Sequence, residues 1–145
     1  MPLNILKLCV GSDSVEDLEE WVAACLAERR RNGKPLEHWH TTRMTPTRGA
    51  EIVCGGSLYW VIKGNVQCRQ LITEIRPFTD GEGIGRCKLM LDPAIVRTEW
   101  QPRRAFQGWR YLKQADAPAD LGKGRKGIAD MPPKLRLELA ELGLL

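Results

Sequence analysis

The residues best suited to do chemistry in this chain are arginines and aromatic rings that gather between residues 97 and 113. Five basic side chains stand there against a single acid, Glu99, and they surround the run Phe106-Gln-Gly-Trp-Arg-Tyr-Leu112. Guanidinium groups bind phosphates, and flat aromatic faces stack on unpaired bases. This combination predicts a surface that binds RNA or a nucleotide, including a modified one.

Further basic and aromatic residues in the middle of the chain extend this prediction. The competing interpretation is that the rings fill the core or its edges, as bulky aromatic residues usually do, while the arginines are solvated around them. We expect stacking from Trp60 and Trp109. We expect phosphate contacts from Arg43, Arg48, Lys63, Arg69, Arg103, Arg104 and Arg110.

The net positive charge is concentrated in the middle part of the chain, which contains these residues. The 145 residues carry 22 basic and 18 acidic side chains, a formal charge of +4. Residues 1–40 contribute −2 (5 basic, 7 acidic), residues 41–113 contribute +6 (12 and 6), and residues 114–145 contribute zero (5 and 5). A basic region attracts polyanions, although a surplus of this size is also compatible with an ordinary solvated surface.

The sequence carries no established catalytic motif, and it predicts no catalytic residue, no cofactor and no metal site. Phosphate-binding loops, nucleophile elbows and zinc-protease motifs are missing. His38 and His40 alternate as a His-x-His pair, but spacing suggests no third metal ligand. The two histidines with Thr42, Lys63 and Glu74 are the residues from which an enzymatic base or nucleophile would come.

Cysteine usage and the N-terminal residues bear on the compartment. Five cysteines lack any Cys-x-x-Cys pair, and the first ten residues have no basic region before their apolar stretch. No run of about 18 apolar residues predicts a membrane span. We therefore expect a cytoplasmic protein with reduced thiols, without contact to a membrane.

Hydrophobic periodicity predicts the elements that must position these side chains. A helix is expected over about 15–31, because Ser14 can cap the first turn and one apolar stripe at helical spacing follows, formed by Val15, Leu18, Trp21, Val22, Cys25 and Leu26. Alternation and turn signals predict strands elsewhere. The expected strands are 3–10, 36–43, 57–62, 66–75, 86–91 and 105–112, with a short element at 49–54, a short irregular continuation at 94–99 and a C-terminal helix at 134–142.

This element order predicts an α+β fold, a small and mostly antiparallel β-barrel with one N-terminal helix packed on it and a short C-terminal helix. Residues 1–113 form the single globular domain, and residues 114–145 form a Gly/Pro-rich loop followed by that helix. If the leucines of the terminal helix do not pack on the domain, a protein partner would cover them.

Two runs in the chain resemble a bacterial protein family catalogued as domain of unknown function 1489. They are Gly55-Gly-Ser-Leu-Tyr-Trp-Val-Ile-Lys-Gly64 and Phe106-Gln-Gly-Trp-Arg-Tyr-Leu112, within a resemblance that extends from Leu3 to about Leu121. This kinship implies no assigned activity.

A second resemblance concerns the short helical segment that leads to Gly55-Gly56 and the two strands that follow. It is similar to the core of PUA-like and ASCH-like domains, whose small β-barrel presents a cleft to RNA or modified nucleobases. Those domains usually have Gly-Asp at this position, and the Lys/Thr/Glu set of the ASCH amidohydrolases has no clear match here. The alternatives are a small amidohydrolase or nuclease-like enzyme acting on a modified nucleoside, and a non-catalytic interaction subunit of a larger assembly.

Overall fold

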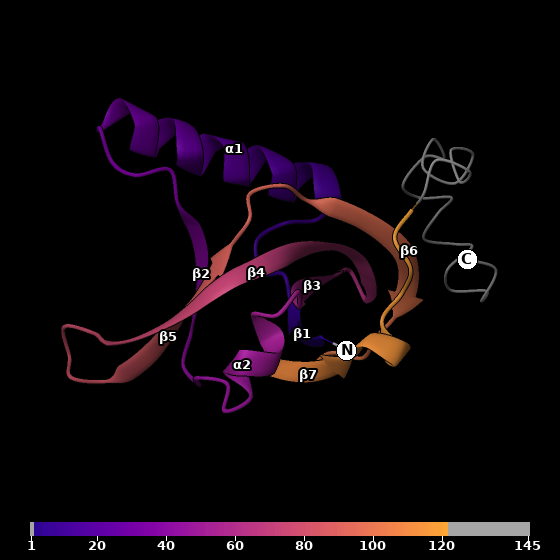
Figure 1. The fold of residues 1–145 in the computed structure, drawn as a ribbon. Coiled ribbons are helices and arrows are strands. Elements are labelled where there is room, and N and C mark those ends of the chain that lie inside the picture. The colour runs from indigo at the N-terminus through magenta and orange to yellow at the C-terminus, as the bar shows by residue number, and fades with distance from the viewer. Residues whose placement is uncertain (1, 122–145) are drawn as a thin grey trace.

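The computed structural model of the chain describes residues 2–121 (Figure 1). Those residues form an α+β fold, as predicted, in which one long helix lies against a mixed and mostly antiparallel sheet. The elements are β1 (Leu3–Leu8), α1 (Val15–Arg31), β2 (His38–Thr42), α2 (Gly49–Ile52), β3 (Ser57–Ile62), β4 (Asn65–Thr79), β5 (Gly85–Leu91), β6 (Val96–Pro102), β7 (Trp109–Lys113) and the 3-10 turn η1 (Gln114–Asp116).

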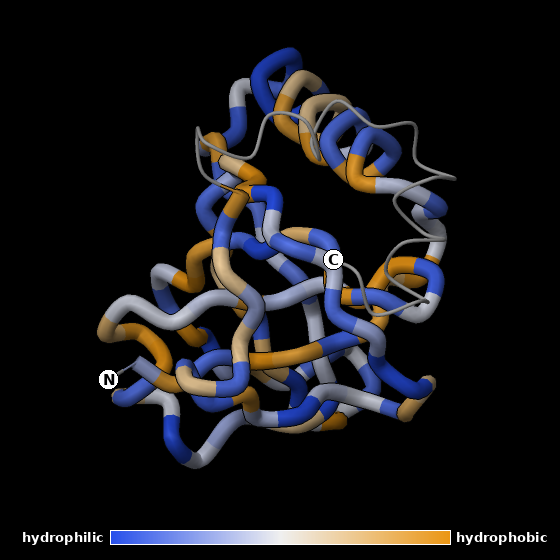
Figure 2. Tube along the Cα trace, turned by 90° about the vertical axis from the view of Figure 1, so that its right-hand side faces the viewer, coloured by the Kyte–Doolittle hydropathy of each residue, from blue (hydrophilic) through white to orange (hydrophobic). Residues whose placement is uncertain are grey.

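Helix α1 begins and ends where its sequence predicts. The Ser14 hydroxyl accepts a hydrogen bond from the Asp17 amide (3.1 Å), and the Asp17 carboxylate accepts one from the Asp13 amide (3.1 Å). Asn32 caps the other end, and Gly33 follows with φ +66°. Figure 2 shows α1 at one end of the molecule, with hydrophobic and hydrophilic residues mixed along its turns. The caps at both ends therefore fix the length of the helix, which lies over the sheet.

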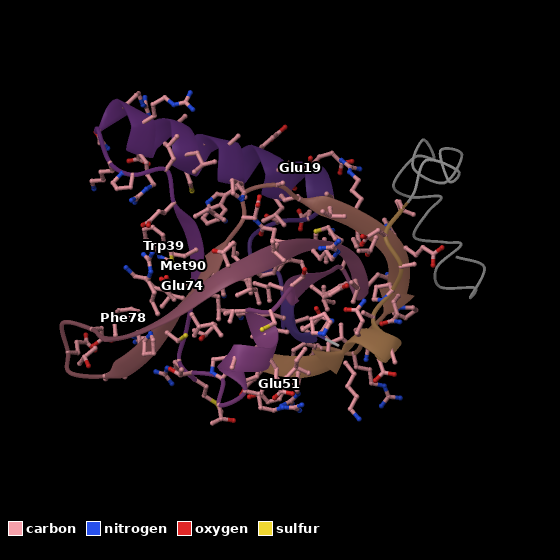
Figure 3. The ribbon with its side chains drawn as sticks, viewed as in Figure 1. Glu19, Trp39, Glu51, Glu74, Phe78 and Met90 are labelled. Atoms are coloured by element: carbon pink, nitrogen blue, oxygen red, sulfur yellow. The ribbon has the colours of Figure 1, made fainter. Side chains whose placement is uncertain are left out.

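The sheet runs in the order β2-β5-β4-β3-β1-β7, with β6 paired to β4. Only β1 and β3 run parallel, because α1 carries the chain back between them. Strand β4 holds the sheet together, since its first half pairs with β3 and β6 and its second half pairs with β5. Trp39 lies opposite Met90, and Met90 lies opposite Glu74, which marks the register of β2, β5 and β4 (Figure 3).

The predicted closed barrel is not confirmed, because the sheet is open. Its path ends at β2 on one side, which pairs with β5, and at β7 on the other, which pairs with β1. No ladder joins these two edge strands within residues 2–121. The backbone groups on their outer edges border a gap, which we call the seam.

The core lies on both faces of β3, whose six residues are all buried. Leu58, Trp60 and Ile62 face the larger cluster beneath α1. Tyr59 and Val61 face a smaller cluster that Leu112 of β7 completes. Successive side chains of a strand point to opposite faces of the sheet, which explains why β3 contributes to both clusters. The same alternation decides which side chains of the neighbouring strands point toward the seam.

Three segments differ from the sequence prediction. The expected irregular stretch 94–99 is strand β6, because Thr98 and Trp100 are buried and the strand pairs with the start of β4. The last strand begins at residue 109 rather than 105, after Gly108 with φ +70°. Residues 119–121 run along β6, with an isolated bridge between Thr98 and Asp120. The helix predicted at 134–142 lies outside the described residues.

Candidate functional site

A groove of about 650 Å³ occupies the seam between the edge strands β2 and β7. We call it the seam groove. Lys7 of β1 lies on it, the loop after β2 contributes Arg43 and Met44, and β7 contributes Trp109 and Arg110. The remaining lining residues are Thr41, Thr42, Arg86, Gln107, Gly108 and Tyr111.

The two rings of β7 hold the loop after β2 across the seam. The Trp109 indole Nε1 donates to the Met44 carbonyl at 3.0 Å. The Tyr111 hydroxyl accepts from the backbone amides of Thr47 (3.1 Å) and Arg48 (3.3 Å). Because Trp109 and Tyr111 are two residues apart on one strand, they share a face, and their rings meet edge to face with centroids 4.9 Å apart.

The seam groove is electrostatically positive. Among residues 2–121, no carboxylate lines it, and none forms an ion pair with Lys7, Arg43 or Arg110. Arg110 lies over the Phe106 ring, 5.6 Å from the centroid. Arg86 differs, because its guanidinium binds Asp80 and holds the pKa of that carboxyl below its usual value. Three cations therefore face this groove without a compensating acid in the described part of the chain.

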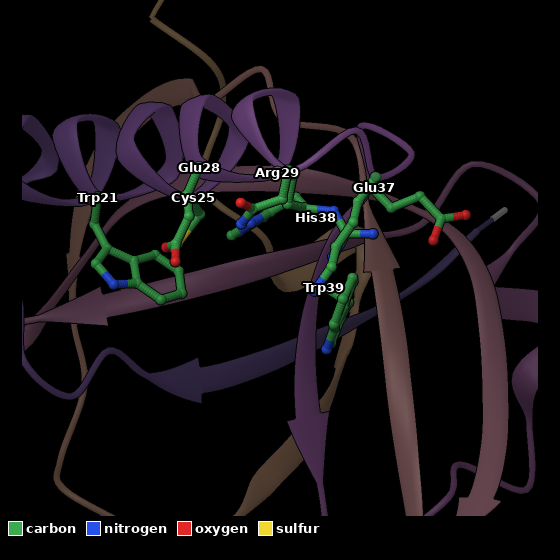
Figure 4. A pocket seen from close by; sticks show the side chains of 9 residues that line it. Trp21, Cys25, Glu28, Arg29, Glu37, His38 and Trp39 are labelled. Carbon is green, nitrogen blue, oxygen red and sulfur yellow. The ribbon is translucent and has the colours of Figure 1, made fainter.

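A second recess continues from the first, between α1 and the strands β1 and β2. We call it the helix hollow, and it comprises two adjoining spaces of about 300 and 350 Å³. Lys7 lines both the seam groove and the nearer space, while Trp21, His38 and Trp39 line both spaces of the hollow. Figure 4 shows Trp21 projecting from the helix, while the Trp39 ring lies beside the strand below it. The two recesses adjoin at Lys7 along the β2 side of the sheet, and we call them together the trough.

His40 and Trp60 lie in the nearer space of the hollow and meet edge to face, with ring centroids 5.2 Å apart. The pKa of His40 is lowered to about 4, chiefly because burial disfavours the charged ring and also because the charges of Lys7 and His38 repel it. The ring is therefore neutral at physiological pH. Its Nε2 atom is buried and has no hydrogen-bond partner among the described residues.

Three of the nine predicted binding residues meet in the seam groove, namely Arg43, Trp109 and Arg110. Trp60 does not join them as an exposed ring. It is 4% exposed, and its indole nitrogen donates to Gln70 at 2.9 Å. The surface stacking role predicted for Trp60 does not fit this position, because the strand alternation turns its ring toward the helix side of the core.

The other predicted phosphate contacts lie outside both recesses, and two of them, Arg48 and Arg103, line a separate pocket of about 600 Å³ beside β7. Arg69 binds Asp120 with two hydrogen bonds of 2.8 and 2.7 Å, and Arg48 binds Glu51. Lys63 lies 3.8 Å from an Asp13 carboxylate oxygen. The last two are Arg103, which contacts Gln101, and Arg104, which is exposed.

The residues considered for enzymatic chemistry do not assemble into a catalytic group. The Thr42 hydroxyl donates to the Met44 carbonyl, and Glu74 binds Arg76. Lys63 lies at the turn between β3 and β4 rather than beside the histidines of β2. Within residues 2–121, no three histidine, cysteine or acidic side chains are placed to hold a metal ion. The described geometry offers the histidines no adjoining carboxylate in the nearer space of the hollow.

Sequence reasoning missed four residues of the trough. Lys7 lies within a buried strand, and Met44 lies in a proline-broken loop. Trp21 belongs to the predicted apolar stripe of α1, yet it is 53% exposed. Trp39 sits between the two histidines that drew attention as metal ligands. For Lys7 the available signal was a charged residue within an apolar strand, whereas the other three residues fit their local sequence patterns.

Comparison with known proteins gives a family. A family model described as "Protein of unknown function (DUF1489)" matches residues 5–145. No curated protein and no solved structure matches. No helix within residues 2–121 is long and apolar enough to cross a membrane.

Proposed function

The chain belongs to the DUF1489 family, whose description names no activity, and we propose that it binds single-stranded RNA or a nucleotide in the seam groove. One observation carries the proposal. Three cations without acidic partners in the described chain, Lys7, Arg43 and Arg110, line the same groove as the half-buried indole of Trp109. Phosphate contacts and aromatic stacking are the two interactions that single-strand binding proteins combine.

In the proposed complex, Arg43 and Arg110 bind phosphates from opposite sides of the seam. Both lie on the rim, and their guanidinium groups keep their charge at every physiological pH. Trp109 presents its ring to a base while its nitrogen stays bonded to Met44, so that the ring is already positioned before the ligand arrives. Such pre-organisation lowers the entropic cost of binding.

The resemblance to PUA-like domains stays a prediction from the sequence, because the sheet is open and no solved structure matches. A cytoplasmic location is part of the proposal and is compatible with an RNA ligand. The amidohydrolase alternative gains nothing from the geometry described above. An interaction subunit remains the second candidate, because Val10 and Met44 are 89% and 68% exposed on the rim of the trough.

The test is a fluorescence anisotropy titration of a labelled single-stranded nonaribonucleotide. We expect binding that weakens between about 50 and 200 mM salt, because phosphate contacts release counterions. Arg110→Ala weakens the affinity and lowers the slope of log K against log salt by about 0.7, the value for one contact on a single strand. Arg43→Ala acts in the same direction.

Arg104→Ala is the matched control, since it removes the same charge from an exposed position outside the trough. We expect its affinity within about twofold of the wild type. No binding at about 50 mM salt, binding without salt dependence, or equal losses from Arg104→Ala and Arg110→Ala contradicts the proposed site.

A further inference from the structure

The seam groove does not end at the seam, because Lys7 also lines the nearer space of the helix hollow. From there Trp21, His38 and Trp39 continue into the farther space. A strand held in the seam groove would follow a path past Lys7 into the hollow beneath α1. A mononucleotide would leave most of that path empty.

Charge marks both ends of the trough. Arg43 and Arg110 stand at the seam, and Arg29 and Lys34 line the far end below the last turn of α1. Two carboxylates also line that far end, Glu28 and Glu37, but Glu37 is paired with Arg76. Cations at the two ends with rings between them match a ligand that alternates phosphates and bases.

The aromatic rings that line the helix hollow bear on whether a planar base could bind there. Trp21 lies on the apolar side of α1, yet it is 53% exposed, and its ring meets that of His38 edge to face, with centroids 5.4 Å apart. Trp39 carries the Arg29 guanidinium 4.9 Å and the Lys88 ammonium 4.6 Å from its ring centroid, so two cations already contact this indole. Figure 4 shows both indoles and the Arg29 side chain bordering the same space.

We propose that the ligand is an extended single-stranded RNA, whose phosphates are held at the seam and whose further bases lie against Trp21 in the helix hollow. The inference rests on the proposed function and names its ligand class. Because His38 and His40 have pKa values lowered by burial, the hollow offers a base neutral imidazoles rather than charges.

The test compares a triribonucleotide with a nonaribonucleotide of the same base, each titrated into the wild type, Trp21→Ala and Arg110→Ala. We expect Trp21→Ala to weaken the long oligonucleotide about tenfold, the loss of one stacked base, and to leave the short one unchanged. Arg110→Ala weakens both. Trp21→Phe keeps a ring and retains most of the affinity. Leu36→Ala, which truncates another exposed apolar residue, changes neither.

The outcomes separate this inference from the function on which it rests. If Arg110→Ala weakens both oligonucleotides and Trp21→Ala weakens neither, the strand stays in the seam groove and the inference is overturned while the proposed function stands. Equal losses for both lengths in Trp21→Ala also overturn it, since the short ligand should not reach the hollow. If neither oligonucleotide binds the wild type, the proposed function itself fails.

Discussion

Trp60 and Gln70 form a buried polar pair at the centre of the molecule. The indole nitrogen of Trp60 donates to the Gln70 carbonyl oxygen at 2.9 Å, and the Gln70 amide donates to the Asp92 carbonyl at 3.1 Å. Gln70 is fully buried. An acceptor that loses its donor in such a place costs its full desolvation.

We therefore expect Trp60→Phe to lower the free energy of unfolding by about 1–3 kcal/mol beyond the loss of ring area. Urea denaturation measures it. The double variant Trp60→Phe with Gln70→Met removes both partners and should be less destabilised than the sum of the two single changes. Additive losses would show that the hydrogen bond contributes nothing.

His40 predicts a pH dependence of stability. Its folded pKa is about 4 against an ordinary value near 6.5, so the unfolded chain binds its proton first as the pH falls. Stability attributed to His40 is complete above about pH 6.5 and declines toward pH 4, by at most about 3 kcal/mol. The wild type should therefore lose stability relative to His40→Gln across this range. Parallel unfolding curves for the two proteins would contradict it.

At the scale of elements, the junction of α2 and β3 depends on Gly56. A β-carbon there would lie 2.1 Å from the Leu3 carbonyl oxygen and 2.6 Å from that of Ile52, both of them backbone atoms. We expect Gly56→Ala to destabilise the fold by more than about 4 kcal/mol or to prevent folding. Gly81→Ala is the control, because open space surrounds that glycine, and it should stay within about 0.5 kcal/mol of the wild type.

The loop that crosses the seam depends on the Tyr111 hydroxyl, which accepts from two of its amides. We expect Tyr111→Phe to raise hydrogen exchange at the amides of Thr47 and Arg48, because their acceptor is lost. Exchange in β4 should stay unchanged. Unaltered protection at Thr47 and Arg48 would show that the loop is held by other contacts.

The elements themselves were largely predictable from local patterns. Helix 15–31 and strand 57–62 match exactly, since capping, apolar spacing and a turn at Gly64 are encoded nearby. Strand β6 was missed because its partner is some 30 residues earlier in the chain, at the start of β4. The open seam was also not predictable, because sheet closure depends on twist and register rather than on any one segment.

The candidate site was predictable only in part, for the same reason. Arg43 and Arg110 are far apart in sequence, and only the approach of β2 to β7 brings them to one groove. Arg69 carried the same sequence signal, but the pairing of 119–121 with β6 supplies it with Asp120. The residue types in the sequence indicated a basic surface with aromatic rings. Only the fold decides which of the basic side chains have an acidic partner and which do not.

At the scale of the whole molecule, five tryptophans report directly on the central claim. Trp109 lies in the seam groove, Trp21 and Trp39 border the helix hollow, Trp60 forms its floor, and Trp100 is buried in β6 outside the trough. Each indole N–H gives one signal in a proton–nitrogen NMR spectrum. The decisive measurement is a titration of the nitrogen-15 protein with a single-stranded nonaribonucleotide. The account predicts that the Trp109 signal shifts most and that Trp100 stays in place; an unmoved Trp109 signal at saturating RNA would contradict it.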